Sequence, residues 1–202
     1  MIRFGAFTDT QTDLVRAQAA EEERALIERA KSQSDAFEEL YTRYYGKIFS
    51  FAYRRLHSRE LAEDITADVF MKALDALPRF TWQGVSVSAW LYRIANNRIT
   101  DHFRRKGQSG KGVLNIDDVK TLVDERPLAE DRILASLRRR EVEEAISKLS
   151  DQDQLVVTLI FYEELSSPEV AQVMGISTNL VYVRLHRALK RMRRVLEREG
   201  AQ

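Results

Sequence analysis

The fold of this chain is decided by the stretch SSPEVAQVMGISTNLVYVRLHRALKRMRR, residues 166–194. Ser166 stands three residues before Glu169, which is the spacing of a capping box, and Ser167, followed by proline, would equally suit an N-cap. Gly175 stands where a helix needs a left-handed C-terminal residue. The pattern predicts a short helix, a tight turn and a longer helix that crosses it steeply, which is a helix-turn-helix.

The longer helix, which Ser177 can cap, has strongly segregated charge. Residues 184–198 contain seven Lys or Arg residues and one acidic residue. Solvated helix faces usually mix both signs, so this bias favours DNA binding over an ordinary amphipathic helix. One face holds Val181, Leu185, Ala188 and Met192, and the other holds Arg184, Arg187, Lys190, Arg191 and Arg194.

Position along this helix predicts what each side chain would contact. A helix that enters the major groove with its N-terminal turns brings its first residues to the base edges and its later basic residues to the phosphates. The expected base-side residues are Thr178, Asn179, Tyr182, Val183 and Arg184, and the later basic residues are Arg187, Lys190 and Arg191.

Composition limits the other possibilities. The chain has 202 residues, enough for one large domain or two small ones, and a formal net charge of only +1. Any nucleic-acid footprint must therefore come from segregated charge. The absence of cysteine excludes disulfides and thiolate metal sites. The sequence shows neither a signal peptide nor an apolar run near 20 residues, so we expect a cytoplasmic protein.

A first helical domain is predicted at residues 34–106, after an N-terminal extension, residues 1–33, whose role the sequence does not indicate. Aromatic residues such as Phe37, Tyr41 and Tyr44 recur at helical spacing, which is more often typical of a core than of a ligand site.

The next predicted helix, residues 60–77, carries an acidic flank in which Glu60, Asp64 and Asp68 recur at four-residue spacing with Glu63 beside them. The helix dipole accounts for carboxylates in the first turn but not for Asp68, which lies more than two turns in. Two interpretations therefore stand equal, an ordinary helix start and a docking surface for a basic protein. The opposite stripe, expected in the core, is Leu61, Ile65, Val69, Phe70, Ala73, Leu74 and Leu77.

Pro78 ends this helix, and a loop at residues 79–88 contains Phe80, Trp82, Gln83 and Ser86. Aromatic and small hydrogen-bonding side chains suit base stacking and base-edge reading, although a loop tucked onto the core is the simpler interpretation. Residues 89–106 predict a second basic helix, whose asparagines can read adenine and whose arginines can hold phosphate or guanine. Its polar residues are Arg93, Asn96, Asn97, Arg98, Arg104 and Arg105.

Residues 107–136 have the composition of a flexible acidic linker, and residues 137–202 supply two more helices before the helix-turn-helix. The three histidines lack metal-ligand spacing, so we expect no metal, no cofactor and no enzymatic activity. The predicted fold class is all-α, with two small helical domains joined by the linker.

The runs DAFEELYTRYYGKIFSFAYRRL, LAEDITADVFMKAL and WLYRIANNRITDHFRRK resemble region two of the extracytoplasmic-function sigma factors of bacterial RNA polymerase. The run EEAISKLSDQDQLVVTLIFYEELSSPEVAQVMGISTNLVYVRLHRALKRMRRVL resembles their region four. The resemblance implies a subunit that binds core RNA polymerase and directs promoter recognition, DNA melting and transcription initiation.

By the same resemblance, the acidic flank would bind the clamp helices of the largest polymerase subunit, and the flap of the second-largest subunit would be a further contact. The loop and second basic helix would bind the minus-ten promoter element, with one base flipped into the loop. Residues 137–202 would bind the minus-thirty-five element, and the linker would thread toward the active cleft. Many relatives are held inactive by an anti-sigma factor, so such a partner is implied, whereas a small-molecule substrate is not.

One departure from the family lies at the exposed start of the recognition helix, where Leu180, Tyr182 and Val183 replace the usual small, polar or basic residues. They could meet thymine methyl groups or dock an inhibitor protein. For the whole chain, the alternatives are a stand-alone helix-turn-helix repressor or activator and a nucleic-acid enzyme with a carboxylate metal site. The acidic flank and the second basic helix favour the sigma factor over the repressor.

Overall fold

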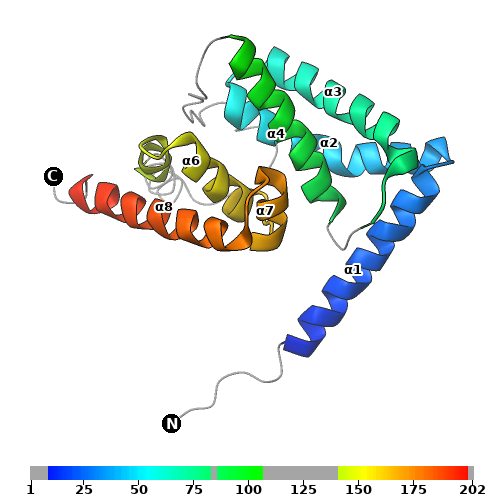
Figure 1. Ribbon diagram of the computed structural model, residues 1–202, viewed down its shortest axis with the longest axis horizontal. Coiled ribbons are helices and arrows are strands. Elements are labelled where there is room, and N and C mark those ends of the chain that lie inside the picture. The colour runs from blue at the N-terminus through cyan, green and yellow to red at the C-terminus, as the bar shows by residue number, and fades with distance from the viewer. Residues whose placement is uncertain (1–8, 83–85, 107–140, 200–202) are drawn as a thin grey trace, which may run out of the picture.

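The structure is a computed structural model that describes residues 9–82, 86–106 and 141–199. These residues form helices and connecting turns, without a strand among them, so the predicted all-α class is confirmed. Figure 1 shows two groups of helices side by side. The first group is α1 (Asp9–Ala30), α2 (Ser34–Leu56), α3 (Arg59–Ala76) and α4 (Val87–Arg105), and the second is α6 (Asp151–Val157), α7 (Ser167–Met174) and α8 (Thr178–Glu199). The expected linker lies outside the described residues.

Short caps set the boundaries in the first group. Helix α2 ends at Leu56, and the next residue, His57, adopts a left-handed conformation with φ 51°. The Ser58 hydroxyl then accepts a hydrogen bond from the Leu61 backbone N–H at 3.3 Å and begins α3. Because the side chain satisfies a helical donor that otherwise has no partner, serine fixes the start of α3.

The connection between α3 and α4 differs slightly from the sequence prediction. Helix α3 ends at Ala76, and Pro78 lies in a single 3-10 turn, Leu77–Arg79. The Ser86 hydroxyl accepts from the Ala89 N–H at 3.3 Å, so α4 begins at Val87, two residues before the predicted start. Residues 83–85, and with them Gln83, lie outside the described part of the chain.

The core of the first group lies between α2, α3 and α4. Leu40, Ile48, Leu91 and Ile99 are fully buried there. The predicted core stripe of α3 is wrong at one position, because the Leu74 side chain is 44% exposed. Leu74 follows Phe70 by one turn, but it lies at the edge of the apolar stripe.

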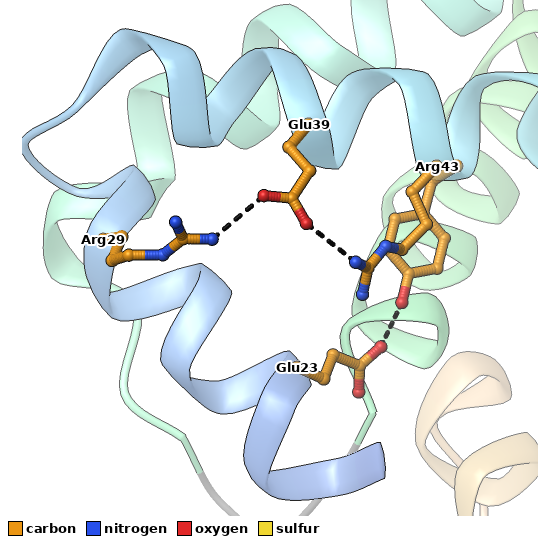
Figure 2. A network of polar contacts seen from close by, with 5 residues as sticks. Glu23, Arg29, Glu39 and Arg43 are labelled. Atoms are coloured by element: carbon orange, nitrogen blue, oxygen red, sulfur yellow. Dashed lines mark hydrogen bonds and ion pairs between the residues drawn. The ribbon is translucent and has the colours of Figure 1, made fainter.

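The end of the N-terminal extension is part of this core. Leu26, Ile27 and Ala30 of α1 are buried in the same apolar cluster as α2. In Figure 2 the Glu39 carboxylate lies between Arg29 of α1 and Arg43, and it accepts hydrogen bonds from them at 2.9 and 2.8 Å.

A second polar contact joins the same two helices. The Tyr44 hydroxyl donates to the Glu23 carboxylate, and burial, together with this carboxylate, raises the pKa of Tyr44 above its usual range. Helix α1 is thus anchored by its C-terminal half, whereas its first turns project away from the other helices in Figure 1.

The helix-turn-helix forms as its capping residues and its glycine predict. The Glu169 carboxylate accepts from the Ser166 backbone N–H at 2.8 Å, which identifies Ser166 rather than Ser167 as the cap of α7. Gly175 has φ 67°, a conformation in which a side chain would be strained. Ser177 caps α8 through the Leu180 N–H at 3.3 Å.

The preceding helix is less regular than predicted. The sequence pattern predicts one helix over residues 151–162, but α6 covers only its first part, and one π-helical turn, Thr158–Tyr162, follows. Residues 141–147 are also helical. Within the described ranges, every helix is too short or too polar to span a lipid bilayer.

The two groups of helices share one continuous core. Helix α4 packs directly against α7. Leu165, Val170, Ala171 and Val173 belong to the same buried cluster as the core of the first group. The apolar surfaces of the two groups of helices are therefore joined.

Candidate nucleic-acid and polymerase interfaces

The loop before α4 holds its aromatic side chains against the core. Phe80 packs on Trp90 of α4, with ring centroids 4.6 Å apart and a tilt of 48°. Phe80 and Trp82 are half-buried and contact the apolar cluster of the first group. The simpler interpretation of the sequence, a loop tucked onto the core, therefore describes these two rings.

A cavity of about 620 Å³ opens beside this loop, between the end of α3 and the middle of α4. Its lining combines cationic groups with an aromatic ring and an amide, which together suit a nucleotide. Two aspartates in the lining keep its charge mixed. The residues are Lys72, Arg79, Arg98, Asp75, Asp101, Asn97, Trp90, Ile94 and Ala76.

The polar residues of α4 divide between different surroundings. Asn97 and Arg98 line the cavity, and Arg93 and Arg105 are exposed. The Asn96 amide oxygen instead accepts a long hydrogen bond from Arg55 of α2 at 3.4 Å. Two of the predicted DNA-binding arginines of the helix also have nearby partners: Arg104 pairs with Asp101 at 3.0 Å, and Arg98 pairs with Asp68 of α3.

The Arg98–Asp68 pair shows that one carboxylate of the acidic flank has a partner within the chain. Arg98 donates to the Asp68 carboxylate through its Nε and Nη2 atoms, so this pair ties α3 to α4. The helix dipole could not account for Asp68, and a partner 30 residues away in the sequence does. The remaining carboxylates of the flank are exposed, with Glu63 held by Arg59 at 2.9 Å.

An exposed stripe along α3 continues this flank with apolar side chains. Glu60, Asp64, Met71 and Leu74 are all exposed and follow one another at intervals of four, seven and three residues, which correspond to one or two helical turns, so they share one helix face. Tyr41 of α2 is also exposed and packs on Phe70, with centroids 4.7 Å apart. The stripe is acidic at its N-terminal end and apolar at its C-terminal end.

The start of α8 presents the predicted surface. Tyr182 is 55% exposed, and Leu180 and Val183 are also exposed, whereas Val181 and Ala188 are buried. Asn179 is exposed and Thr178 half-buried. The later basic residues Arg187, Lys190 and Arg191 face solvent.

Arg184 differs from the other basic residues of α8. Its Nη1 atom donates to the Asp153 carboxylate of α6 at 3.2 Å, and the two side chains are only 28% and 20% exposed. Its guanidinium therefore points toward α6 and ties the recognition helix to the rest of its group.

Comparison with known families matches both groups of helices. The sigma-70 region 2 profile matches residues 40–109, and the profile of sigma-70, region 4 matches residues 139–192. This chain is a sigma factor. A sigma factor directs RNA polymerase to initiate transcription at particular promoters, and the predicted function is confirmed at this level.

Individual relatives place the sigma factor in the extracytoplasmic-function (ECF) group. It is 35% identical to the ECF RNA polymerase sigma factor BldN of Streptomyces coelicolor, over 85% of this chain and 64% of BldN. It is 34% identical to the RNA polymerase sigma factor YlaC of Bacillus subtilis, over 76% of this chain and 88% of YlaC. These relatives are sigma factors, which are not enzymes.

A solved structure resembles the fold of both groups together. The structure of CnrH in complex with the cytosolic domain of CnrY has a TM-score of 0.62 at 25% identity, and the match covers 87% of this chain and 97% of that chain. CnrH is an RNA polymerase sigma factor of Cupriavidus metallidurans.

Several residues of the sigma factor's surfaces escaped the sequence prediction. Lys72 and Arg79 join the cavity from α3 and the turn after it, and Met71 and Leu74 complete the α3 stripe. Lys72 and Arg79 could have been predicted because they lie close to the loop in the sequence. Leu74 could not, because a leucine in an apolar stripe gives no indication that it is exposed. Among the described residues, no group of three or more His, Asp or Glu side chains is arranged to hold a metal ion.

Proposed function

We propose that the sigma factor uses three separate surfaces for polymerase, for the melted minus-ten element and for the minus-thirty-five duplex. The proposal rests on one observation: the acidic and apolar stripe of α3, the cavity between α3 and α4 and the basic face of α8 have no residue in common. Residues 34–106 would form the first functional domain and residues 137–202 the second, with residues 107–136 as the linker.

The α3 stripe is our candidate for core polymerase binding. Exposed carboxylates at Glu60, Glu63 and Asp64 suit a basic helical surface, and Met71 and Leu74 supply apolar area beside them. Protein interfaces combine an apolar centre with a polar rim, and the stripe has both. Asp68 would then act within the sigma factor, by positioning Arg98, rather than at the polymerase. The flap of the second-largest polymerase subunit is a further proposed contact.

The cavity beside α4 is our candidate for the single-stranded minus-ten element. A base taken from the stack needs a pocket, and unstacking costs a few kcal/mol that the pocket must return. Asn97 and the Trp90 ring could contact a base while Arg98, Arg79 and Lys72 hold phosphates. Arg93, Arg104 and Arg105 would extend this basic track along α4.

Helix α8 is our candidate for the minus-thirty-five duplex. Asn179, Tyr182 and Val183 face outward near its start, and Arg187, Lys190 and Arg191 face outward farther along. The first set would meet base edges and the second phosphates. Docking of an inhibitor on Leu180, Tyr182 and Val183 is the alternative for the same face.

The remaining assignments follow from the sigma-factor family. We propose that the protein works in the cytoplasm without enzymatic activity, cofactor or small-molecule substrate. CnrH was solved with the cytosolic domain of CnrY, and the sigma factor RpoE of Bartonella quintana with the anti-sigma factor NepR, which supports an anti-sigma partner for this chain. A stand-alone repressor or activator would need no polymerase-binding stripe.

The test of this proposal is co-elution of the purified chain with core RNA polymerase, followed by run-off transcription. Alanine at Trp90 and Asn97 should leave co-elution intact and abolish permanganate reactivity of promoter thymines, because only melting would be lost. Thr100→Ala is the matched control, because it truncates an exposed, uncharged side chain of α4 outside the cavity lining. Normal promoter melting by the Trp90 and Asn97 variant would mean that another surface binds the minus-ten element.

A further inference from the structure

The first two turns of α8 hold a single cation, Arg184, and its charge is already paired. Residues 178–183 include neither lysine nor arginine. Arg184 donates to the Asp153 carboxylate of α6 at 3.2 Å and points toward that helix. Arg187, the next cation, lies farther from the N-terminal turns that would enter the major groove. The start of α8 therefore lacks the group that most often reads guanine, which is an arginine or lysine bound to O6 and N7.

The outward face at the start of α8 has an apolar centre instead. Successive residues of a helix are rotated by about 100°, so the exposed Val183 lies almost opposite the buried Val181. Asn179 stands one turn before Val183 and Lys190 two turns after it, so these three exposed residues share the outward face. Tyr182 flanks the same face and is also exposed. Val183 thus stands between an amide that can read a base and a cation that can hold a phosphate.

We propose that the start of α8 reads thymine through its C5 methyl group, with Val183 as the central contact and Tyr182 beside it. This inference rests on the proposed minus-thirty-five surface and names the base chemistry that the surface selects. In the major groove thymine is the base that presents a methyl group, and apolar side chains contact it. Asn179 can bind adenine through N6 and N7, so Asn179 and Val183 together select A·T pairs.

Burial of apolar surface gives this face its discrimination. Contact between an exposed valine and a methyl group removes apolar surface from water on both partners. The same valine placed against the edge of guanine or cytosine would cover hydrogen-bonding groups and offer them no partner, which is unfavourable. The cations Arg187, Lys190 and Arg191, which are exposed farther along α8, suit a phosphate backbone and favour DNA over an inhibitor protein as the occupant.

Deoxyuridine tests the methyl contact directly, because it differs from thymidine only in lacking the C5 methyl group. Holoenzyme made from the full chain and core polymerase first selects promoters from a pool of genomic fragments. Each thymine of a selected minus-thirty-five element, on either strand, is then replaced singly by deoxyuridine, and affinity is measured by competition. At one position or more, the parent should lose about fourfold in affinity, the factor expected for burial of one methyl-sized group.

Val183→Ala identifies the side chain that makes the contact. At one position where the parent distinguishes thymine from deoxyuridine about fourfold, this variant should distinguish them by less than about twofold. Leu189→Ala is the matched control, because Leu189 is 42% exposed, close to the 44% of Val183, and lies farther along α8. The Leu189→Ala holoenzyme should keep the deoxyuridine effect of the parent at every position.

The outcomes separate this inference from the surface on which it rests. A selected element without thymine, or one in which no deoxyuridine weakens binding, would overturn the inference. A loss of affinity at 7-deazaguanine, which lacks the N7 acceptor, would then show that a cation reads guanine and that the minus-thirty-five surface stands. An equal deoxyuridine effect in the parent and in Val183→Ala would also overturn the inference. If scrambling the whole minus-thirty-five element leaves affinity unchanged, the proposed surface itself fails.

Discussion

The sharpest prediction concerns Arg184, because its position in the sequence and its position in the structure indicate different roles. From its place in the second turn of α8 it should read a base, whereas the structure pairs it with Asp153 at 3.2 Å. We expect Arg184→Met, which keeps most of the aliphatic stem, to destabilise the fold while leaving promoter preference unchanged.

The magnitude follows from the burial of the pair. The side chains are 28% and 20% exposed, so the pair lies between a surface ion pair, worth about 0–1 kcal/mol, and a buried one, whose disruption costs about 3–5 kcal/mol. We therefore expect a loss of about 1–3 kcal/mol in the free energy of unfolding. For a chain of this size, that loss lowers the Tm by about 2–12 °C.

Two measurements and one control decide the role of Arg184. Thermal unfolding followed by circular dichroism gives the change in Tm, and a double-mutant cycle with Asp153→Asn isolates the pairwise energy. Binding of the reconstituted holoenzyme to promoters with varied minus-thirty-five elements gives the order of preference. Arg187→Met, at an exposed position, should leave the Tm unchanged, weaken all promoters alike and lower the salt slope by about one. An unchanged Tm with a reordered preference for Arg184→Met would refute our reasoning.

Three further predictions follow from the other contacts. Asp64→Lys should weaken association with core polymerase by ~1 kcal/mol without changing the Tm. Asp68→Lys should also lower the Tm, because Asp68 pairs with Arg98. Equal effects of the two variants on polymerase association and on the Tm would contradict the separate roles of Asp64 and Asp68. Ile27→Ala should cost about 2–4 kcal/mol of stability in urea unfolding, since Ile27 is fully buried, and no loss would mean that α1 is dispensable. Burial and Glu23 raise the pKa of Tyr44, so the folded state binds the Tyr44 proton more tightly than the unfolded state does. The free energy of unfolding should therefore fall as the pH rises above about 10. Tyr44→Phe should make that fall less steep in unfolding measured between pH 8 and 12.

The local features of the fold could be predicted from short sequence spacings. The Ser166–Glu169 capping interaction, the left-handed Gly175 and the serine caps of α3 and α8 each involve residues at most a few positions apart. A cap depends only on backbone donors within one turn, so the residue type and its spacing suffice to predict it. The same holds for the buried face of α8, which follows from helical periodicity.

Within the candidate site, the sequence indicated which helices carry charge but not where each charged side chain points. Asp68 and Arg98 were expected on two different functional surfaces, and they bind each other. Arg184 was expected at a base, and it binds Asp153. Partners about 30 residues apart meet only when the helices that carry them cross at a particular angle and register. Hydrophobic periodicity predicts which face of a helix is buried, but it does not predict the angle and register at which two helices cross.

The sequence by itself therefore determined an all-helical chain with two sigma-factor regions, their caps, their buried faces and the segregation of charge onto α3, α4 and α8. Only the tertiary structure decided that the end of α1 joins the first core and that Glu163 meets Arg54, 109 residues away. The physical reason is the range of the interactions. Caps and stripes are set by neighbours along one helix, whereas the burial of an ion pair depends on how two separately folded surfaces pack together.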